Sequence, residues 1–214
     1  MLNLEQGRAY LALPEAEQGA GVLLIHPWWG LTEFFGALAD RLAGEGFVVL
    51  APDLYHGATA ETVEEADALR LKLDPDAVIA QLDEALDYLR AHPAVTSADL
   101  GVIGFSLGAS WGLYLSHHRP DVVGALVAFY GTYDGDLSNM RAAFQGHFAE
   151  ADDYEPREAL EALDATLTGM SLEATFFVYS GAGHWFFEAD RMAYHPESAR
   201  LSWEWTLKFL REKL

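Results

Sequence analysis

The sequence predicts an α/β protein with a mainly parallel sheet, built as one domain over residues 1–214. Short apolar runs alternate with helical patterns along almost the whole chain, as they do where parallel strands are joined by crossover helices. Several of these runs are apolar without interruption, which is typical of strands covered on both faces. No internal repeat and no linker breaks the pattern, so we expect one hydrophobic core.

Seven strands are expected from the short apolar runs that polar or turn-forming residues bound. They are Ala9 to Leu13, Gly21 to Ile25, Phe47 to Leu50, Leu100 to Ile103, Val122 to Phe129, Ala142 to Phe148 and Ala174 to Tyr179.

Helices are expected in the longer connections. Asp74 and Pro75 form a helix start, because an aspartate suits the N-cap and a proline suits the first helical position. Apolar residues follow at helical spacing, namely Val78, Ile79, Leu82, Ala85, Leu86 and Leu89. Further helices are indicated over Ala60 to Leu73, over Ala109 to His118, from Pro156 to near Gly169, and from Pro196 to the end.

The composition excludes several kinds of partner and chemistry. Thirteen Lys and Arg residues against 33 Asp and Glu residues give a formal net charge of −20, which repels phosphate, so nucleic acid is not expected as a partner. The absence of cysteine excludes disulfides, thiolate metal sites and a cysteine nucleophile. No apolar stretch could span a bilayer and no secretory signal is visible, so we expect a cytoplasmic protein without a membrane partner.

The central motif is Gly104-Phe105-Ser106-Leu107-Gly108, which matches G-x-S-x-G. It stands directly after one predicted strand and directly before one predicted helix, the context in which an α/β-hydrolase carries its nucleophile on a sharp turn. The two glycines are needed because larger residues would prevent the turn from closing. The motif therefore predicts Ser106 as a nucleophile.

A serine hydroxyl is a weak nucleophile and needs a histidine base that a carboxylate orients. In α/β-hydrolases these groups follow the serine in the order acid, then histidine, each after a strand. His184 fits this order, because it lies in a Gly-rich segment just after the strand Ala174 to Tyr179. Asp152 fits as the acid after the preceding strand, and Asp153 and Glu150 are its rivals.

The remaining histidines suggest structural roles. His117 and His118 lie at the expected end of a helix, where cationic side chains are favourable. His26 closes a core strand near the expected site, where a structural role is favoured over a catalytic one. No histidine shows metal-ligand spacing with another histidine or with carboxylates, so no metal is expected.

Two backbone amides are candidates for an oxyanion hole. One is the amide of Leu107, at the start of the helix after Ser106. The other should come from the loop after the strand Gly21 to Ile25, where Pro27 has no N–H and the amide of Trp28 is next in the chain. The rings of Trp28 and Trp29 either wall the substrate pocket or pack in the interior.

Several segments together resemble the dienelactone hydrolase family, over roughly residues 8 to 212. The segments are Ile25 to Leu31, Ala51 to Gly57, Gly104 to Gly108, Phe129 to Gly131, Asp152 to Pro156, Tyr179 to Phe186 and Ala193 to Trp205. The resemblance implies an α/β-hydrolase-type three-layer sandwich without a lid domain. It also implies Ser106 as nucleophile, Asp152 as acid and His184 as base, with the acid two residues before Tyr154.

The chain departs from the family's founding enzymes at three positions. Those enzymes have cysteine where this chain has Ser106, and a glutamate that activates the thiol where it has Pro27. An arginine that holds the substrate's carboxylate aligns with Glu188. Three features predict a preference for uncharged short esters over carboxylate-bearing lactones. They are Glu188, the net charge of −20, and the aromatic residues expected to bind substrate, Trp29, Trp185 and Phe186.

The expectation from the sequence is a serine hydrolase that cleaves small esters or lactones through an acyl-enzyme, with no metal and no organic cofactor. Two alternatives stay open on the same fold. The triad could act on thioester, amide or peptide substrates, or the chain could bind a small molecule without turnover. The expected oligomeric state is a monomer or a homodimer.

Overall fold

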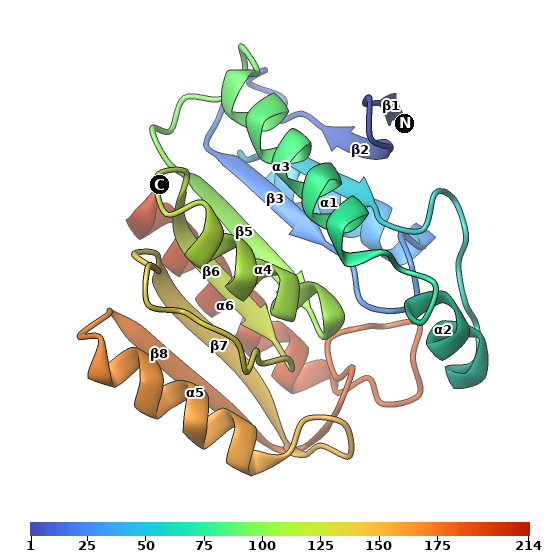
Figure 1. The fold of residues 1–214 in the computed structure, drawn as a ribbon, viewed down its shortest axis with the longest axis vertical. Coiled ribbons are helices and arrows are strands. Elements are labelled where there is room, and N and C mark those ends of the chain that lie inside the picture. The colour runs from blue at the N-terminus through green and yellow to red at the C-terminus, as the bar shows by residue number, and fades with distance from the viewer.

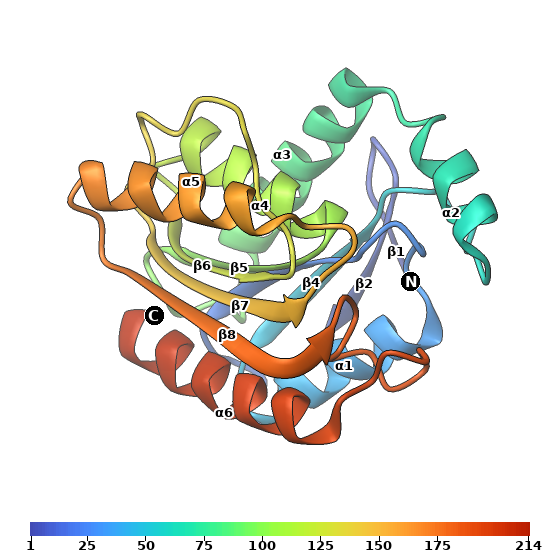
Figure 2. The ribbon, with the colours of Figure 1, turned by 90° about the horizontal axis from the view of Figure 1, so that it is seen from below.

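An eight-stranded sheet forms the middle layer of the molecule, with helices on both faces (Figures 1 and 2). The computed structural model describes residues 1–214. The strand order is β1-β2-β4-β3-β5-β6-β7-β8, and only β1 and β2 run antiparallel to their neighbours. The strands are β1 (Leu2–Asn3), β2 (Arg8–Ala12), β3 (Gly21–Ile25), β4 (Val48–Asp53), β5 (Leu100–Phe105), β6 (Val123–Phe129), β7 (Ala143–Ala151) and β8 (Ala174–Gly183).

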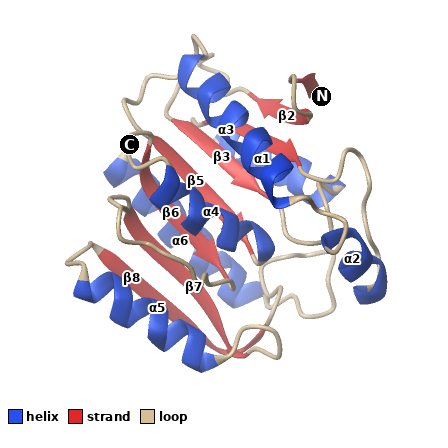
Figure 3. Ribbon diagram, viewed as in Figure 1, coloured by secondary structure: helices blue, strands red, loops and turns tan.

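Six helices accompany the sheet (Figure 3). They are α1 (Glu33–Gly44), α2 (Val63–Arg70), α3 (Pro75–Ala91), α4 (Leu107–His118), α5 (Arg157–Gly169) and α6 (Pro196–Lys213). In Figure 2, α3, α4 and α5 lie on one face of the sheet and α1 and α6 on the other, while α2 stands at the side. No helix combines the length and the apolar character that crossing a bilayer requires.

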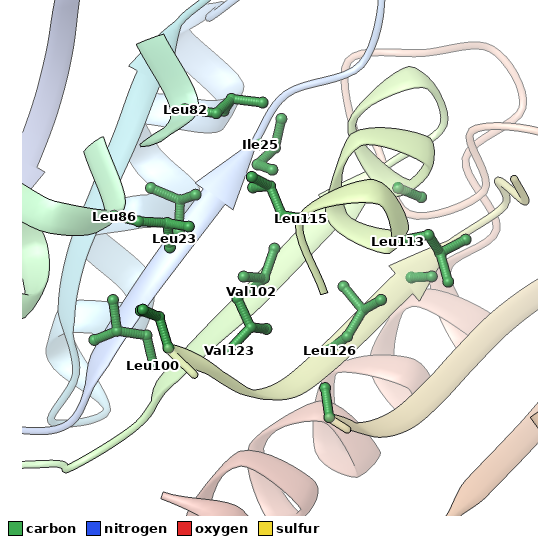
Figure 4. Close-up of a cluster of buried hydrophobic side chains, with 14 of the residues drawn as sticks. Leu23, Ile25, Leu82, Leu86, Leu100, Val102, Leu113, Leu115, Val123 and Leu126 are labelled. Atoms are coloured by element: carbon green, nitrogen blue, oxygen red, sulfur yellow. The ribbon is translucent and has the colours of Figure 1, made fainter. Parts of the chain in front are cut away.

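Each face of the sheet carries its own hydrophobic cluster, because successive side chains of a strand point to opposite sides. On β3, Leu23 and Ile25 belong to the cluster under α3, α4 and α5, whereas Val22 and Leu24 belong to the one under α1 and α6. Figure 4 shows part of the first cluster, in which leucines of α3 and α4 contact the strands. This two-sided burial explains the uninterrupted apolar runs in the sequence.

The predicted α/β fold with a mainly parallel sheet is confirmed, and every predicted strand is present. The two-residue strand β1 and the helix α1 are not among the predicted elements, and several strands are longer than predicted: β4 continues to Asp53, β7 to Ala151 and β8 to Gly183. These strands pair with a neighbour beyond the ends of their apolar runs, at Asp53 of β4 and at Ala151 of β7, where a search for apolar runs does not follow them. The short connection from β6 to β7, residues 130–142, holds no helix and no inserted lid.

Parallel pairing brings the carboxyl ends of the central strands to one edge of the sheet. Ile25 of β3 pairs with Gly104 of β5, and Phe129 of β6 pairs with Phe105 of β5 on one side and His147 of β7 on the other. The loops that follow β3, β5, β7 and β8 therefore meet at this edge, which is where open α/β sheets bind their ligands.

A buried polar cluster connects the last helix to the sheet. The hydroxyl of Tyr179 on β8 donates to Nδ1 of His147 on β7 at 2.8 Å, in the tautomer that has its hydrogen on Nε2. Nε2 of His147 lies 3.1 Å from Oε1 of Gln145 and 3.2 Å from the hydroxyl of Thr206 on α6. Burial lowers the pKa of His147 to about 3, so this side chain is neutral in the folded protein above that pH.

We expect His147 to make the protein less stable as the pH falls. Between pH 6.5 and about 4.5 the unfolded chain binds a proton on this imidazole that the folded protein does not bind, which costs about 2–3 kcal/mol of unfolding free energy. Urea unfolding of the wild type and of His147→Gln at both pH values measures the difference, and the variant should lack this part of the loss. His56→Gln, which removes an exposed histidine, should keep it. Equal pH dependence in wild type and His147→Gln would contradict the expectation.

Candidate active site

Ser106 occupies a strained turn between β5 and α4. Its backbone φ of +50° and ψ of −113° lie outside the regions that side-chain-bearing residues favour. A Cβ atom at Gly104 would lie 2.2 Å from the carbonyl oxygen of Gly108, and one at Gly108 would lie 2.3 Å from that of Ile25. Only glycine fits at either position, so the turn can close and raise the serine side chain above the sheet edge.

The structure brings Ser106, His184 and Asp152 together in a line of hydrogen bonds. The Ser106 hydroxyl lies 2.9 Å from Nε2 of His184, and Nδ1 of His184 lies 2.8 Å from each carboxylate oxygen of Asp152. In the neutral tautomer with hydrogen on Nδ1, the imidazole donates to Asp152 and accepts from Ser106. The histidine and aspartate side chains are each only 4% exposed, which shields this arrangement from water.

Backbone hydrogen bonds hold the Asp152 carboxylate toward His184. The amides of Tyr154 and Glu155 both donate to Oδ1 of Asp152 at 2.9 Å, in a turn that directly follows β7. The rival Asp153 is exposed and makes no hydrogen bond to His184. The other rival, Glu150, accepts hydrogen bonds from the hydroxyl of Ser180 and the amide of Gly181, so it connects β7 to β8.

His184 lies at the first position of a tight turn that follows β8. The amide of Phe186 donates to the carbonyl of Gly183, and the amide of Glu188 donates to the carbonyl of Trp185. Trp185 adopts a left-handed backbone conformation with φ of +64°. The expected Gly-rich loop is therefore the end of an extended strand and a compact turn, which restricts where the imidazole can lie.

The two residues expected to supply oxyanion donors lie on separate elements. Leu107 is the first residue of α4, where a helical N–H has no acceptor within the helix. The amide of Trp28, in the loop after β3, makes no backbone hydrogen bond. Both residues line the cavity that contains Ser106 and His184.

His26 fixes the loop that carries Trp28. Its Nδ1 lies 2.6 Å from the carbonyl oxygen of Pro27, and its Nε2 accepts a hydrogen bond from the amide of Leu54 at 3.1 Å. The residue is fully buried, and burial lowers the pKa of its imidazole. His26 thus makes structural contacts between the loops after β3 and β4, in agreement with the favoured reading of the sequence.

The cavity beside Ser106 is small, about 150 Å³, and open to solvent. Its lining consists of Trp28, Arg70, Ser106, Leu107, Tyr154 and His184. The sequence analysis missed two of these residues. Tyr154 lies two residues after Asp152 and packs against the rings of Trp28 and His184, a proximity that the acid's position could have suggested. Arg70 comes from α2, far away in the sequence, and no sequence signal identified it.

The predicted substrate-binding aromatic residues lie behind this lining. Phe186 is fully buried and packs against Tyr130 and Tyr179, so a place on the pocket wall is wrong for it. Trp29 is also buried, with 3% of its surface exposed, and its ring packs against the ring of Trp28 in the cavity lining. Trp185 is half-buried and stacks on Trp28 with 6.0 Å between ring centroids. It therefore contacts a residue of the cavity lining without belonging to the lining.

The prediction that Glu188 faces the substrate is wrong. Glu188 is fully buried, and its Oε1 accepts a hydrogen bond from the hydroxyl of Tyr130 at 2.7 Å. Burial raises the pKa of Glu188 to about 8. Because the carboxyl lies in the interior, it cannot repel an anionic substrate by direct contact, and the charged group in the cavity lining is instead the cation Arg70.

Two larger hollows lie away from the Ser106 hydroxyl. One, of about 370 Å³, runs between α5 and β8 and is lined by several carboxylates. Among them, Glu150, Glu155 and Glu161 already have partners in Ser180, Thr132 and Arg157. The other, of about 430 Å³, lies between α2 and α3. In neither hollow do three or more His, Asp or Glu side chains lie so that together they could hold a metal ion.

Comparisons with known proteins agree with the fold. The model of the dienelactone hydrolase family matches residues 8–214. A protein from Aquifex pyrophilus named "Protein usf" is 30% identical over 97% of this chain and 94% of its own length. One from Aquifex aeolicus, named "Putative carboxymethylenebutenolidase", is 27% identical with the same coverage. The crystal structure of a "Putative Dienelactone Hydrolase" from Klebsiella pneumoniae superimposes with a TM-score of 0.85 at 26% identity, covering 95% of this chain and 92% of the other.

We expect Gly104→Ala to unfold the turn that carries Ser106. The added methyl group would have to push backbone atoms of α4 aside, at a cost of about 1–3 kcal/mol or more, and would displace the serine. Gly36→Ala is the matched control, because a Cβ at this position of α1 meets nothing within 4 Å and alanine favours a helix by up to about 1 kcal/mol. Thermal unfolding measures both, and a Gly104→Ala variant as stable as Gly36→Ala would contradict the expectation.

Proposed function

The chain belongs to the dienelactone hydrolase family, and we propose that it hydrolyses small esters or lactones with Ser106 as nucleophile, through an acyl-enzyme. Membership of this family makes it a carboxylic ester hydrolase. The observation that carries the finer proposal is the line of hydrogen bonds from Ser106 through His184 to Asp152, on a strained turn whose glycines allow no larger residue.

In the first half of the proposed reaction the ester is cleaved. His184 accepts the hydroxyl proton of Ser106 on Nε2 while the serine oxygen attacks the carbonyl carbon of the substrate. The imidazolium then gives this proton to the leaving alkoxide, so that an alcohol departs and the acyl group remains on Ser106. Asp152 keeps the imidazole in the required tautomer and stabilises its positive charge.

In the second half water completes the hydrolysis. His184 takes a proton from water, the hydroxide attacks the acyl carbon, and the carboxylic acid leaves as the proton returns to Ser106. In both halves a negative charge develops on the former carbonyl oxygen. The amides of Leu107 and Trp28 are the donors we assign to it, because both residues line the cavity beside Ser106 and their amides have no backbone acceptor. All groups in this route belong to the chain, so it needs no cofactor.

The size and lining of the cavity define the substrate class we propose. A cavity of about 150 Å³ is smaller than the 300–1,000 Å³ typical of sites for drug-sized ligands, which favours short acyl groups or compact lactones. The side chain of Arg70 is 44% exposed and forms a salt bridge with Asp67 at 2.6 Å. It supplies the guanidinium in the lining of the cavity. We therefore infer that a substrate carboxylate is accommodated, in place of the preference for neutral esters that the sequence suggested.

The triad can be tested by single and double substitutions. We expect Ser106→Ala and His184→Ala each to lose nearly all turnover and their combination to lose no more, because the two groups act in one step. Asp152→Asn should lower kcat on the order of 10⁴-fold, as a misplaced tautomer does in serine proteases. Asp153→Asn is the matched control, since it neutralises an exposed carboxylate one residue away and should leave kcat close to wild type.

Two results would contradict this assignment. A double variant much slower than either single variant would mean that Ser106 and His184 act in separate steps. A large loss in Asp153→Asn together with near-normal kcat in Asp152→Asn would move the acid to the neighbouring residue. Hydrolysis of a short p-nitrophenyl ester measures kcat, and circular dichroism checks that each variant is folded.

The role of Arg70 can be tested with a carboxylate-bearing ester and its neutral isostere. We expect Arg70→Gln to lower the ratio of their kcat/KM values about 3–10-fold, which corresponds to the roughly 1 kcal/mol that an exposed charge pair contributes. The effect should shrink as salt rises. Arg157→Gln changes the net charge equally at an 85% exposed position on α5 and should leave the ratio unchanged. An unchanged ratio in Arg70→Gln would exclude contact with the substrate carboxylate.

A further inference from the structure

Glu188 and Tyr130 form a fully buried hydrogen bond that the proposed chemistry does not use. The Tyr130 hydroxyl donates to Oε1 of Glu188 at 2.7 Å, and neither residue is exposed to solvent. Burying a carboxyl group costs several kcal/mol unless its environment compensates, so its presence in the interior calls for a specific partner. The two residues are 58 positions apart in the chain, and the bond connects the loop after β6 to the turn after β8.

This bond lies beside the proposed base. The ring of Tyr130 packs against the imidazole of His184, with 4.9 Å between ring centroids and an interplanar angle of 57°. Glu188 ends the turn that begins at His184, and its amide donates to the carbonyl of Trp185 within that turn. Tyr130 itself directly follows the strand whose last residue, Phe129, accepts the amide hydrogen of Ser106 at 2.9 Å. The bond therefore couples the serine's turn to the histidine's turn.

The second oxygen of Glu188 extends the network to the aromatic wall. Oε2 of Glu188 and Nε of Arg191 are both buried without a hydrogen-bond partner, and they face each other at 3.8 Å. The guanidinium of Arg191 lies over the ring of Trp29 with its Cζ 4.0 Å from the ring centroid. Trp29 in turn packs against Trp185, the residue after His184. Glu188 is thus connected to Tyr130 directly and to Trp185 through Arg191 and Trp29.

We propose that Glu188 and Tyr130 are positioning residues that hold the His184 imidazole in line between Ser106 and Asp152. The inference rests on the proposed function, because it assigns the two residues to the base of that reaction. Neither residue reaches the cavity lining, so they act through His184 and not on the substrate. A misplacement of about 1 Å in a reacting group can cost 10²-fold in rate, so a bond that restricts this turn affects turnover strongly.

Three variants isolate the bond. Tyr130→Phe keeps the ring against His184 and removes the donor. Glu188→Leu keeps the volume approximately and removes the acceptor. Glu188→Gln keeps an acceptor oxygen in the same place, and it matches the uncharged form that the raised pKa of Glu188 favours at neutral pH.

We expect Tyr130→Phe and Glu188→Leu each to lower kcat about 10–100-fold with KM changed less than about twofold, because the substrate contacts are intact. The double variant should lose no more than either single variant, since both remove the same bond. Glu188→Gln should recover most of the kcat lost in Glu188→Leu. The rate at which a fluorophosphonate probe labels Ser106 should fall in parallel with kcat.

A matched control separates positioning from stability. Tyr179→Phe removes another buried tyrosine hydroxyl, the one that donates to His147 at 2.8 Å. It should lower the unfolding temperature as Tyr130→Phe does and leave kcat of the folded enzyme at the wild-type value. Measuring kcat, KM and the unfolding temperature for both variants gives the comparison directly.

The outcomes distinguish this inference from the function on which it rests. If the wild type labels at Ser106 and hydrolyses esters, but Tyr130→Phe labels equally fast and loses only stability, the positioning role is wrong and the proposed function stands. If KM rises and kcat does not change, Glu188 acts on the substrate and the inference also fails. If wild-type Ser106 neither labels nor turns over any ester, the proposed function fails and the inference fails with it.

Discussion

The close approach of backbone at the turn after β5 is the constraint on which the site depends. At Gly104 and Gly108 the start of α4 comes so near to β5 and β3 that no Cβ atom fits. This contact forces Ser106 into its left-handed conformation and directs its side chain away from the sheet. It also places Leu107, whose amide has no backbone acceptor, at the start of α4 directly after the serine. A strained backbone persists here because the packed core on both faces of β5 holds its surroundings in place.

Asp152 and His184 are held near Ser106 by different kinds of contact. Asp152 is oriented by two backbone amides within its own turn, so its geometry depends on a few neighbouring residues. His184 is held by longer-range contacts, because its turn is connected to the loop after β6 through Tyr130 and Glu188. The parallel register of β5, β6, β7 and β8 makes these contacts possible, since it brings all their carboxyl ends to one edge.

The buried carboxyl of Glu188 also changes how the charge of the chain should be interpreted. A net charge of −20 describes the molecule as a whole, whereas the cavity beside Ser106 has a guanidinium in its lining and a carboxyl group in the interior behind it. A charge in contact with the substrate acts over a few ångströms, whereas salt screens the field of distant surface charges. The substrate preference we propose therefore rests on Arg70 in the cavity lining and not on the composition of the chain.

The sequence alone determined the features that depend on short segments of chain. Apolar runs with turn residues between them predicted the parallel sheet, because two-sided burial needs uninterrupted apolar strands. The motif around Ser106 predicted the turn, because the contact that requires glycine at position 104 is with the carbonyl of Gly108, at the other end of the same five-residue motif. The order of Asp152 and His184 after successive strands predicted that both would lie near Ser106, and the structure brings the three side chains within hydrogen-bond distance because strand order controls which loops meet.

Only the tertiary structure decided which side chains face the cavity. Phe186, Glu188 and Trp29 lie within four residues of a residue in the cavity lining, yet all three are buried. The tight turn after β8 directs Phe186 and Glu188 into the core, and Trp29 is buried in the loop after β3. Arg70 reaches the cavity from α2, 36 positions before Ser106 in the chain. Burial and orientation are set by contacts between segments far apart in the sequence, and a motif read along the chain carries no information about such contacts.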